Sequence, residues 1–379
     1  MTEKKIGNIE AIAVVLTVMI NHIILNLPKS IISTTSSGSI INVIFVTLIA
    51  FIIVYLISQL LKSFPELDIL DISKFLGGKI LKFIIGALFL CYLIFTISIV
   101  LRSFSETLKI IFFPRTPVQI IMLLFLLAIV FVNKLGFQAI ARSNLFFMPI
   151  ILFSILFIFV ANFGNYTVQR VFPLLGNGAV STFLSGISNL FAFGGIAYLY
   201  FLPPHLKEQK DYTKIAFSAI GVSGIFLLMS VTTLLLLFPL LTSSEEILPL
   251  YLAARFIEFG RFFQRLDAVF VFTWIISMAC YLSLALYFAT NIFKKITNIQ
   301  YSKWVIGLIA SICFGIALIP QDLKQISFLE NNVYKFIILI LVIGVGLGIL
   351  IFANIKNLIL QKKKGLSVLP ENNKSYERS

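Results

Sequence analysis

The chain has 379 residues, of which 59% are hydrophobic and only 12% carry a charged side chain. A water-soluble domain has about a quarter of its residues charged, so this composition excludes an ordinary globular protein. The formal net charge of +14 does not indicate nucleic-acid binding, because the lysines and arginines stand singly or in pairs between apolar runs. The composition therefore predicts an integral membrane protein that contacts the lipid bilayer and binds no nucleic acid.

Apolar runs long enough to cross a bilayer recur along the whole chain. A hydrocarbon layer of roughly 30 Å needs about 20 helical residues, and a helix satisfies its backbone N–H and C=O groups internally. The predicted fold class is an all-α polytopic membrane protein with about ten transmembrane helices. We expect these spans near residues 9–32, 40–61, 80–101, 118–133, 145–162, 182–203, 215–240, 267–290, 303–320 and 334–357.

The basic residues predict the orientation of the chain. Most of them fall in connections that share one side of the membrane with the N-terminus, and positively charged connections tend to stay cytoplasmic. Both termini are therefore predicted to be cytoplasmic. We expect residues 1–360 to form one transmembrane domain with two five-helix halves, at about 1–163 and 181–360, and residues 361–379 to form a polar cytoplasmic tail.

The reactive side chains indicate neither catalysis nor metal binding. Cys91, Cys280 and Cys313 each lie within an apolar run and show no metal-ligand spacing. No HExxH, Ser-His-Asp or Gly-rich phosphate motif accompanies the two histidines, and we interpret His205 as a solvated loop residue. We predict no catalytic residue, metal or cofactor. The alternative is an intramembrane acyl-transfer enzyme with His22 as general base.

Two of the predicted spans contain residues that weaken a helix. In the first span three polar side chains and Pro28 fall at lipid depth, and in the sixth the pair Gly194-Gly195 lies at the middle. Spans one and six hold corresponding positions in two five-helix halves, which is the layout of a 5+5 inverted-repeat transporter-like fold with broken helices. In such folds unwound backbone N–H groups and the dipoles of half-helices bind a ligand carboxylate.

The ligand-binding residues that we predict lie at these two breaks and at similar depth in neighbouring spans. From the breaks we take Asn21, His22, Ile23, Asn26, Phe193, Gly194 and Gly195, and from depth alone Tyr92, Thr96, Trp274 and Ser277. For the polar residues of span one, the alternative is hydrogen bonding that holds spans together. For the four residues chosen by depth, the alternative is helix packing.

The order of several short motifs is similar to that of a known family. Leu27-Pro28 ends the first broken span, Phe64-Pro65-Glu66 follows the second, and Phe113-Pro114-Arg115-Thr116-Pro117 precedes the fourth. The segment from Gly136 to Arg142 links spans four and five, and Arg265-Leu266-Asp267 precedes the eighth. This succession resembles the B-subunit family of spore germinant receptors, a branch of the amino acid, polyamine and organocation transporter superfamily.

The resemblance implies a ten-helix transporter-like fold in the inner membrane of the bacterial spore. It also implies assembly with the A and C subunits of the germinant receptor complex, and sensing of a small-molecule germinant, chiefly an amino acid. Two alternatives remain: a secondary amino-acid transporter and a scaffold subunit that binds no ligand. A coupled transporter needs a buried ionisable side chain, and the nearest acids, Glu10, Glu106 and Asp267, lie at span ends. We therefore favour sensing over coupled transport.

Overall fold

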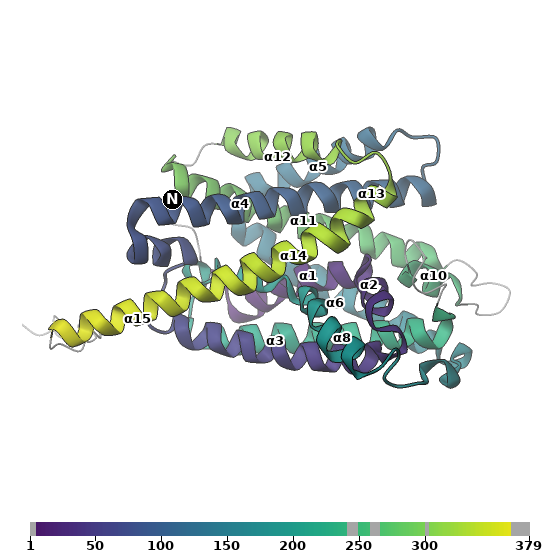
Figure 1. The fold of residues 1–379 in the computed structure, drawn as a ribbon. Coiled ribbons are helices and arrows are strands. Elements are labelled where there is room, and N and C mark those ends of the chain that lie inside the picture. The colour runs from purple at the N-terminus through teal and green to yellow at the C-terminus, as the bar shows by residue number, and fades with distance from the viewer. Residues whose placement is uncertain (1–4, 241–248, 258–265, 300–302, 365–379) are drawn as a thin grey trace, which may run out of the picture.

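The structure is a computed structural model that describes residues 5–240, 249–257, 266–299 and 303–364. These residues are almost entirely helical, and the long helices run side by side (Figure 1). Six helical stretches are long and apolar enough to cross a membrane, and four further apolar helices are shorter. Together they supply the ten spans that the apolar runs predict.

The first half of the chain forms spans one to five. Span one consists of two helices and the next four consist of one each: α1 (Asn8–Ile24), α2 (Leu27–Thr35), α3 (Ser39–Leu61), α4 (Ile69–Ile111), α5 (Val118–Lys134) and α6 (Phe137–Ala161). Short 3₁₀ turns lie in the connections on both sides of the bundle: η1 (Ser36–Gly38), η2 (Phe163–Asn165), η3 (Val168–Val171), η6 (Pro203–His205) and η7 (Gln209–Asp211).

The second half is less regular, because spans six and ten mix helix types. Span six contains the π-helix η4 (Val180–Leu184), the 3₁₀ helix η5 (Ser185–Phe193) and α7 (Ile196–Leu199). Spans seven to nine are α8 (Tyr212–Leu237), α11 (Leu266–Thr297) and α12 (Lys303–Ala317), with α10 (Pro249–Arg255) before α11. Span ten contains α13 (Leu323–Phe328), the π-helix η8 (Leu329–Tyr334), α14 (Lys335–Ile337), the π-helix η9 (Ile338–Val345) and α15 (Gly346–Lys364).

Spans at corresponding positions of the two halves pack in the same group. α1 and α3 pack against α8, and α3 also packs against η5, so spans one, two, six and seven form one group. α4 and α5 pack against α11 and α12, so spans three, four, eight and nine form a second. The two spans of each matching pair are five positions apart in the chain, so they cross the membrane in opposite directions. This arrangement, with interruptions in spans one and six, confirms the predicted 5+5 inverted-repeat fold.

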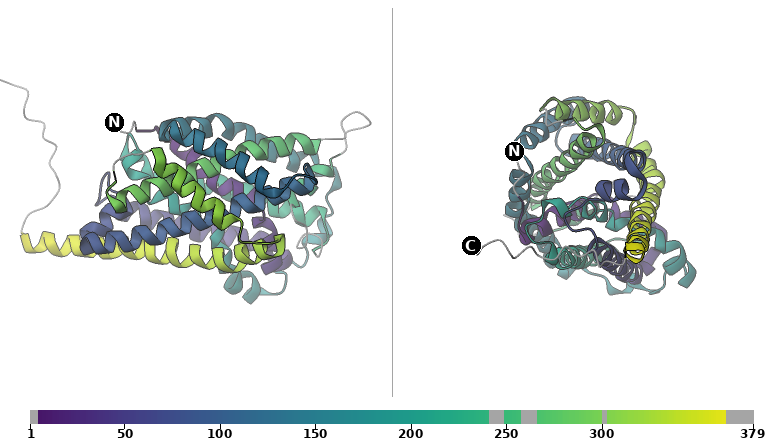
Figure 2. Two further views of the ribbon diagram at one scale, coloured as in Figure 1. Left: turned by 90° about the horizontal axis from the view of Figure 1, so that it is seen from above. Right: turned by 90° about the vertical axis from the view of Figure 1, so that its left-hand side faces the viewer.

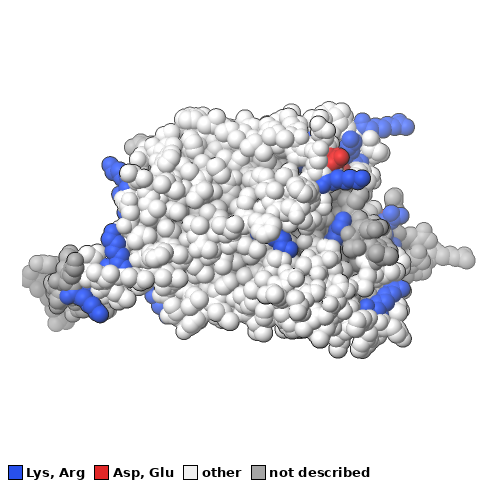
Figure 3. Space-filling view, in the orientation of Figure 1, with Lys and Arg blue, Asp and Glu red and all other residues white. Residues whose placement is uncertain are grey.

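The surface of the bundle is that of an integral membrane protein. Large apolar side chains are exposed along the spans, with Ile52 at 60% and Phe153 at 69% exposure. Figure 3 shows most Lys and Arg side chains near the two ends of the molecule, with a broad uncharged belt between them on the face drawn. Such a belt contacts hydrocarbon, because lipid offers no partner for a charged side chain.

Span one is interrupted at Leu25 and Asn26 as the proline predicts. Pro28 has no N–H to donate to the carbonyl oxygen of Ile24, so the α-helical ladder of α1 cannot continue through it. Proline is instead favourable in the first turn of a new helix, and Pro28 occupies that place in α2. Asn26 lies between the two helices, with φ −114° and ψ −2°.

Span six is interrupted at the glycine pair, but it is tightened rather than unwound. The N–H groups of Gly194 and Ala197 donate to the carbonyl oxygens of Phe191 and Gly194, at 2.9 and 3.0 Å, so the winding there is 3₁₀. The glycines serve close packing: a Cβ on Gly195 would lie 2.7 Å from Met19 Cγ, and one on Gly194 would lie 2.8 Å from Ile338 Cδ1. The expectation of unwound backbone in span six is therefore wrong.

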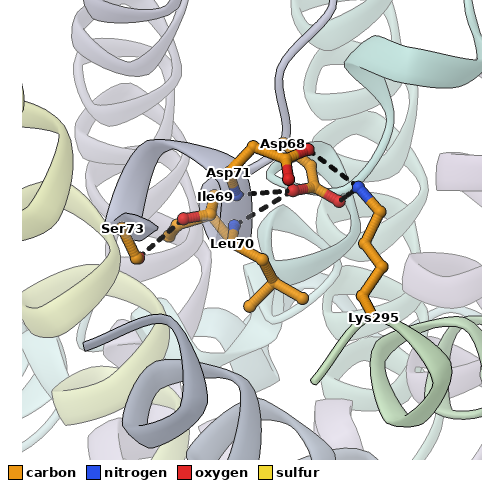
Figure 4. A network of polar contacts seen from close by, with 6 residues as sticks. All are labelled: Asp68, Ile69, Leu70, Asp71, Ser73 and Lys295. Carbon is orange, nitrogen blue, oxygen red and sulfur yellow. Dashed lines mark hydrogen bonds and ion pairs between the residues drawn. The ribbon is translucent and has the colours of Figure 1, made fainter. Parts of the chain in front are cut away.

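The first turns of α4, residues 69–76, form a short arm set off from the rest of that helix. Gly77 and Gly78 make the bend, and Gly78 has φ 72° and ψ −161°, a conformation open to glycine. At the start of the arm, the Asp68 side chain accepts hydrogen bonds from the N–H groups of Leu70 and Asp71 (Figure 4). Asp68 and Asp71 also bind Lys295 of α11, with Nζ–Oδ2 distances of 2.6 and 2.8 Å.

The last helix extends further than the sequence predicts, and the connection around His205 is buried. α15 runs beyond the other helices at one end of the bundle (Figures 1 and 2). Residues 361–364 of the predicted tail belong to this helix, and residues 365–379 lie outside the described residues. His205, expected to be solvated, is only 6% exposed, and its ring packs 4.5 Å from that of Phe137. Two backbone hydrogen bonds with Ile6 hold this connection in place. The Ile6 N–H donates to the carbonyl oxygen of His205, and the Ile6 carbonyl oxygen accepts from the N–H of Lys207.

Candidate functional site

A narrow cavity lies beside the interruption of span one. Its volume, counted as the space that the centre of a water molecule can occupy, is only ≈ 30 Å³. That is room for about two waters, so the described conformation is closed to a ligand as large as an amino acid. Spans one, three, six and ten supply its polar and apolar walls. The polar lining consists of His22, Asn26, Ser30, Thr96, Glu330, Asn331 and Tyr334.

One side of the cavity is a cluster of aromatic rings around His22. Its Nε2 atom lies 3.0 Å from the hydroxyl of Tyr281 in α11 and 3.1 Å from that of Tyr334 in η8. The ring of Tyr334 stacks on that of Tyr92 in α4, with centroids 6.0 Å apart. This cluster therefore joins spans one, three, eight and ten, and one imidazole nitrogen serves two hydroxyl groups.

On another side of the cavity lies the carboxylate of Glu330. Asn26 Nδ2, at the break of span one, donates to Glu330 Oε2 over 2.9 Å. The hydroxyl of Ser103 lies within hydrogen-bonding reach of this carboxylate, and Lys29 is a positive charge in its neighbourhood. Glu330 lies in the π-helix η8, a rare winding that is frequent at functional sites.

Sequence reasoning missed Glu330 because it began span ten near residue 334. The prediction that the acids nearest the spans are Glu10, Glu106 and Asp267 therefore omits this residue. A local signal marks the true start of the helix: the Asp322 side chain accepts from the N–H of Gln325, and the Gln325 side chain accepts from the N–H of Gln321. An acid followed three residues later by Gln is typical of a helix start. Reading it would have placed Glu330 inside span ten, one turn before Tyr334.

The structure brings three of the predicted ligand-binding residues to the cavity: His22, Asn26 and Thr96. Tyr92 reaches it indirectly by stacking on Tyr334. Asn21 points elsewhere and is fully buried, with its Nδ2 donating to the carbonyl oxygens of Thr17 and Ser277 over 2.8 and 3.2 Å. It therefore makes the interhelical hydrogen bond that was the alternative interpretation.

The remaining predicted residues do not line this cavity: Ile23, Phe193, Gly194, Gly195, Trp274 and Ser277. Trp274 is buried against Phe104, with ring centroids 5.0 Å apart. The two glycines set the contact of span six with spans one and ten, as described above. A ligand-binding role for these six residues stays a prediction. Among the described residues, no group of three or more His, Cys, Asp or Glu side chains could hold a metal ion.

The fold is shared with solved transporter structures. The structure of MhsT in complex with L-phenylalanine has a TM-score of 0.67 and 13% identity, covering 89% of this chain and 89% of that one. The structure of Mhp1, a nucleobase-cation-symport-1 family transporter in a closed conformation with bromovinylhydantoin bound, has a TM-score of 0.69 and 13% identity. It covers 97% of this chain and 81% of that one. At such identities the likeness shows the fold alone.

Comparisons of sequence are more specific than those of fold. A family model described as spore germination protein matches residues 5–326. Spore germination protein A2 of Bacillus subtilis (strain 168) is 25% identical over 348 residues, which are 90% of this chain and 94% of that protein. Spore germination protein B2 of the same organism is 22% identical over 347 residues, covering 89% and 93%.

Proposed function

The chain belongs to the spore germination protein family, and we propose that it is the nutrient-sensing membrane subunit of a spore germinant receptor. In this proposal it resides in the inner membrane of the bacterial spore with both termini cytoplasmic. It binds a small molecule such as an amino acid at the broken helix and triggers germination together with the A and C subunits. A reporter fused after Ser379 is then cytoplasmic, and an external reporter would contradict the orientation.

The observation that carries the proposal is the convergence of polar groups at the break of span one. Asn26 and Leu27 line the cavity, so the N-terminus of the nine-residue helix α2 borders it with the positive end of its dipole. Glu330 supplies a negative charge in the same cavity. The positive end of a helix and a negative side chain thus face one small space, which suits a ligand that carries both charges, as an amino acid does.

The apolar wall makes the proposal testable without disturbing these polar groups. Val100 lines the cavity and is 3% exposed, so Val100→Phe would fill the space that a ligand needs. Val160 is 63% exposed on α6, and Val160→Phe adds the same side chain at the lipid surface. Binding of the standard L-amino acids to the full chain in nanodiscs is measured by calorimetry. We expect saturable binding of at least one, lost in Val100→Phe and kept in Val160→Phe.

Spores provide the matching physiological readout. In spores that carry Val100→Phe at normal receptor abundance, germination should need a much higher nutrient concentration, whereas Val160→Phe should leave the dose dependence unchanged. Identical dose curves for both variants, together with no amino-acid binding by the purified chain, would favour the scaffold alternative and contradict the proposal.

A secondary amino-acid transporter is the second candidate function, and Glu330 is the observation that favours it. A half-buried carboxylate beside a broken helix is the kind of group that carries a proton or a coupling ion. Uptake of labelled amino acids into proteoliposomes separates the two functions. Saturable accumulation against a gradient would establish transport, and binding without accumulation would support sensing.

A further inference from the structure

We propose that the cavity recognises its ligand through a protonated primary amine, which binds the carboxylate of Glu330 and replaces the Asn26 amide there. This inference rests on the proposed function and adds the chemical group by which the ligand is selected. It concerns a residue at which no pattern in the amino-acid sequence had indicated a binding role.

The Glu330 carboxylate has unused capacity in the described conformation. A carboxylate has about four acceptor positions. Among the described residues, its hydrogen-bonding groups are the Asn26 amide at 2.9 Å and the Ser103 hydroxyl, both of which are neutral donors. Lys29 contributes a favourable charge from nearby. A ligand ammonium is the donor that would complete this site.

The environment makes a cation the favoured partner. Charge-assisted hydrogen bonds are roughly twice as strong as neutral ones, and they strengthen further where water is scarce. The cavity holds space for about two waters, so Glu330 receives little solvation from that side. A ligand ammonium would form a charge-assisted hydrogen bond with the carboxylate in this water-poor site. A ligand without an amine would leave the carboxylate with its neutral donors.

The Asn26 side chain can lose its hydrogen bond to Glu330 and still find another partner. It lies at the junction of α1 and α2, where the backbone is not part of a continuous helix, and its amide has both a donor and an acceptor end. Once the ammonium occupies Glu330, the Asn26 amide is released to a second ligand group, such as a carboxylate held at the start of α2.

The test compares matched ligands on the wild-type chain, so it does not depend on the folding of a variant. The full chain in nanodiscs is titrated with each standard L-amino acid, then with the des-amino acid and the decarboxylated amine of the tightest binder; for L-alanine these are propionate and ethylamine. D-Glucose and uridine serve as amine-free probes. We expect the des-amino acid to bind at least 100-fold more weakly than the amino acid, and the amine to retain measurable affinity.

Variants then locate the effect at Glu330. Glu330→Gln keeps an acceptor for Asn26 and removes the charge, so affinity for the amino acid should fall at least 50-fold while the weak affinity for the des-amino acid stays unchanged. Glu208→Gln is the matched control, because Glu208 pairs with Lys210 on an exposed connection. That variant should bind like the wild type.

The results separate this inference from the function that it rests on. Equal affinity of the wild type for the amino acid and its des-amino analogue, or binding of D-glucose or uridine but of no amine, would overturn amine recognition and leave nutrient sensing in place. Unchanged amino-acid affinity in Glu330→Gln would also overturn it. Failure of nutrient sensing itself is shown by a different result, the insensitivity of spores to Val100→Phe.

Discussion

Lys356 of span ten lies over the ring of Phe75, with Nζ 5.2 Å from the ring centroid, and also donates to the Phe75 carbonyl oxygen over 2.8 Å. A second hydrogen bond, of 2.9 Å, reaches the carbonyl oxygen of Leu76. These carbonyls lie just before the bend at Gly77 and Gly78, at the C-terminal end of the α4 arm. A cation is favourable there because it faces the negative end of the arm's dipole.

Lys356→Met should lower the free energy of unfolding by about 1–3 kcal/mol, because two partly buried carbonyl oxygens lose their donor. Thermal unfolding of the chain in detergent measures the loss. Lys74→Met is the control, because Lys74 is exposed on the same arm. An equal loss in both variants would show that the effect comes from the missing charge in general and not from these two hydrogen bonds.

Lys295→Met should destabilise the protein by up to about 3 kcal/mol, because it leaves the carboxylates of Asp68 and Asp71 without their cation. The Asp68 side chain is only 3% exposed, so water cannot replace the lysine there. Combining this change with Asp68→Asn should cost less than the sum of the two single changes, which a double-mutant cycle measures.

The ion pair of Lys5 and Glu66 is the exposed control for the less exposed pair of Lys295 and Asp68. The side chains of Lys5 and Glu66 are 38% and 61% exposed, so Lys5→Met should cost less than about 1 kcal/mol. Additive effects of Lys295→Met and Asp68→Asn would contradict a coupled cluster at the start of the α4 arm.

Gly78→Ala should destabilise the protein by about 1–3 kcal/mol through backbone strain alone. Its φ of 72° disfavours any residue with a Cβ, although no atom lies within 4 Å of where that Cβ would be. Gly307→Ala is the matched control, since Gly307 has equally open surroundings within the helix α12. There alanine should be neutral or slightly stabilising, and a similar loss at both positions would rule out strain as the cause.

Gly195→Ala should push span six away from span one, because the new Cβ would lie 2.7 Å from Met19 Cγ. We expect a lower melting temperature and weaker amino-acid binding. Met19→Ala in the same chain should restore part of both, since it removes the atoms that clash. Absence of any rescue would contradict the close contact with Met19 as the reason for a glycine at this position.

Much of the architecture could be predicted from the sequence because its causes are local. Apolar length determines a span, and Pro28 interrupts span one because a missing N–H acts on the turn in which it lies. The winding at Gly194 could not be predicted in this way. Glycine permits many conformations, and the packing of Ile338 against Gly194 and of Met19 against Gly195 selects one.

The candidate site was predictable only in part for the same reason. His22 and Asn26 are conspicuous because they are polar within an apolar run. Their partners Tyr281, Glu330 and Tyr334 come from spans eight and ten, and no spacing in the chain relates them to span one. Glu330 could not be predicted as a site residue because it precedes the apolar run of span ten, in a polar segment that reads as a connection between spans.

Span ten joins the cavity to the α4 arm through segments with π-helical winding. Tyr334 ends η8, the π-helix η9 follows, and Lys356 lies farther along in α15. Each residue of an α-helix turns by about 100°, so the loss of one extra residue from a π-turn would rotate everything beyond it by that angle. Such a rotation would carry Lys356 off the carbonyl oxygens of Phe75 and Leu76. The winding of span ten therefore links the shape of the cavity to the contact with the α4 arm.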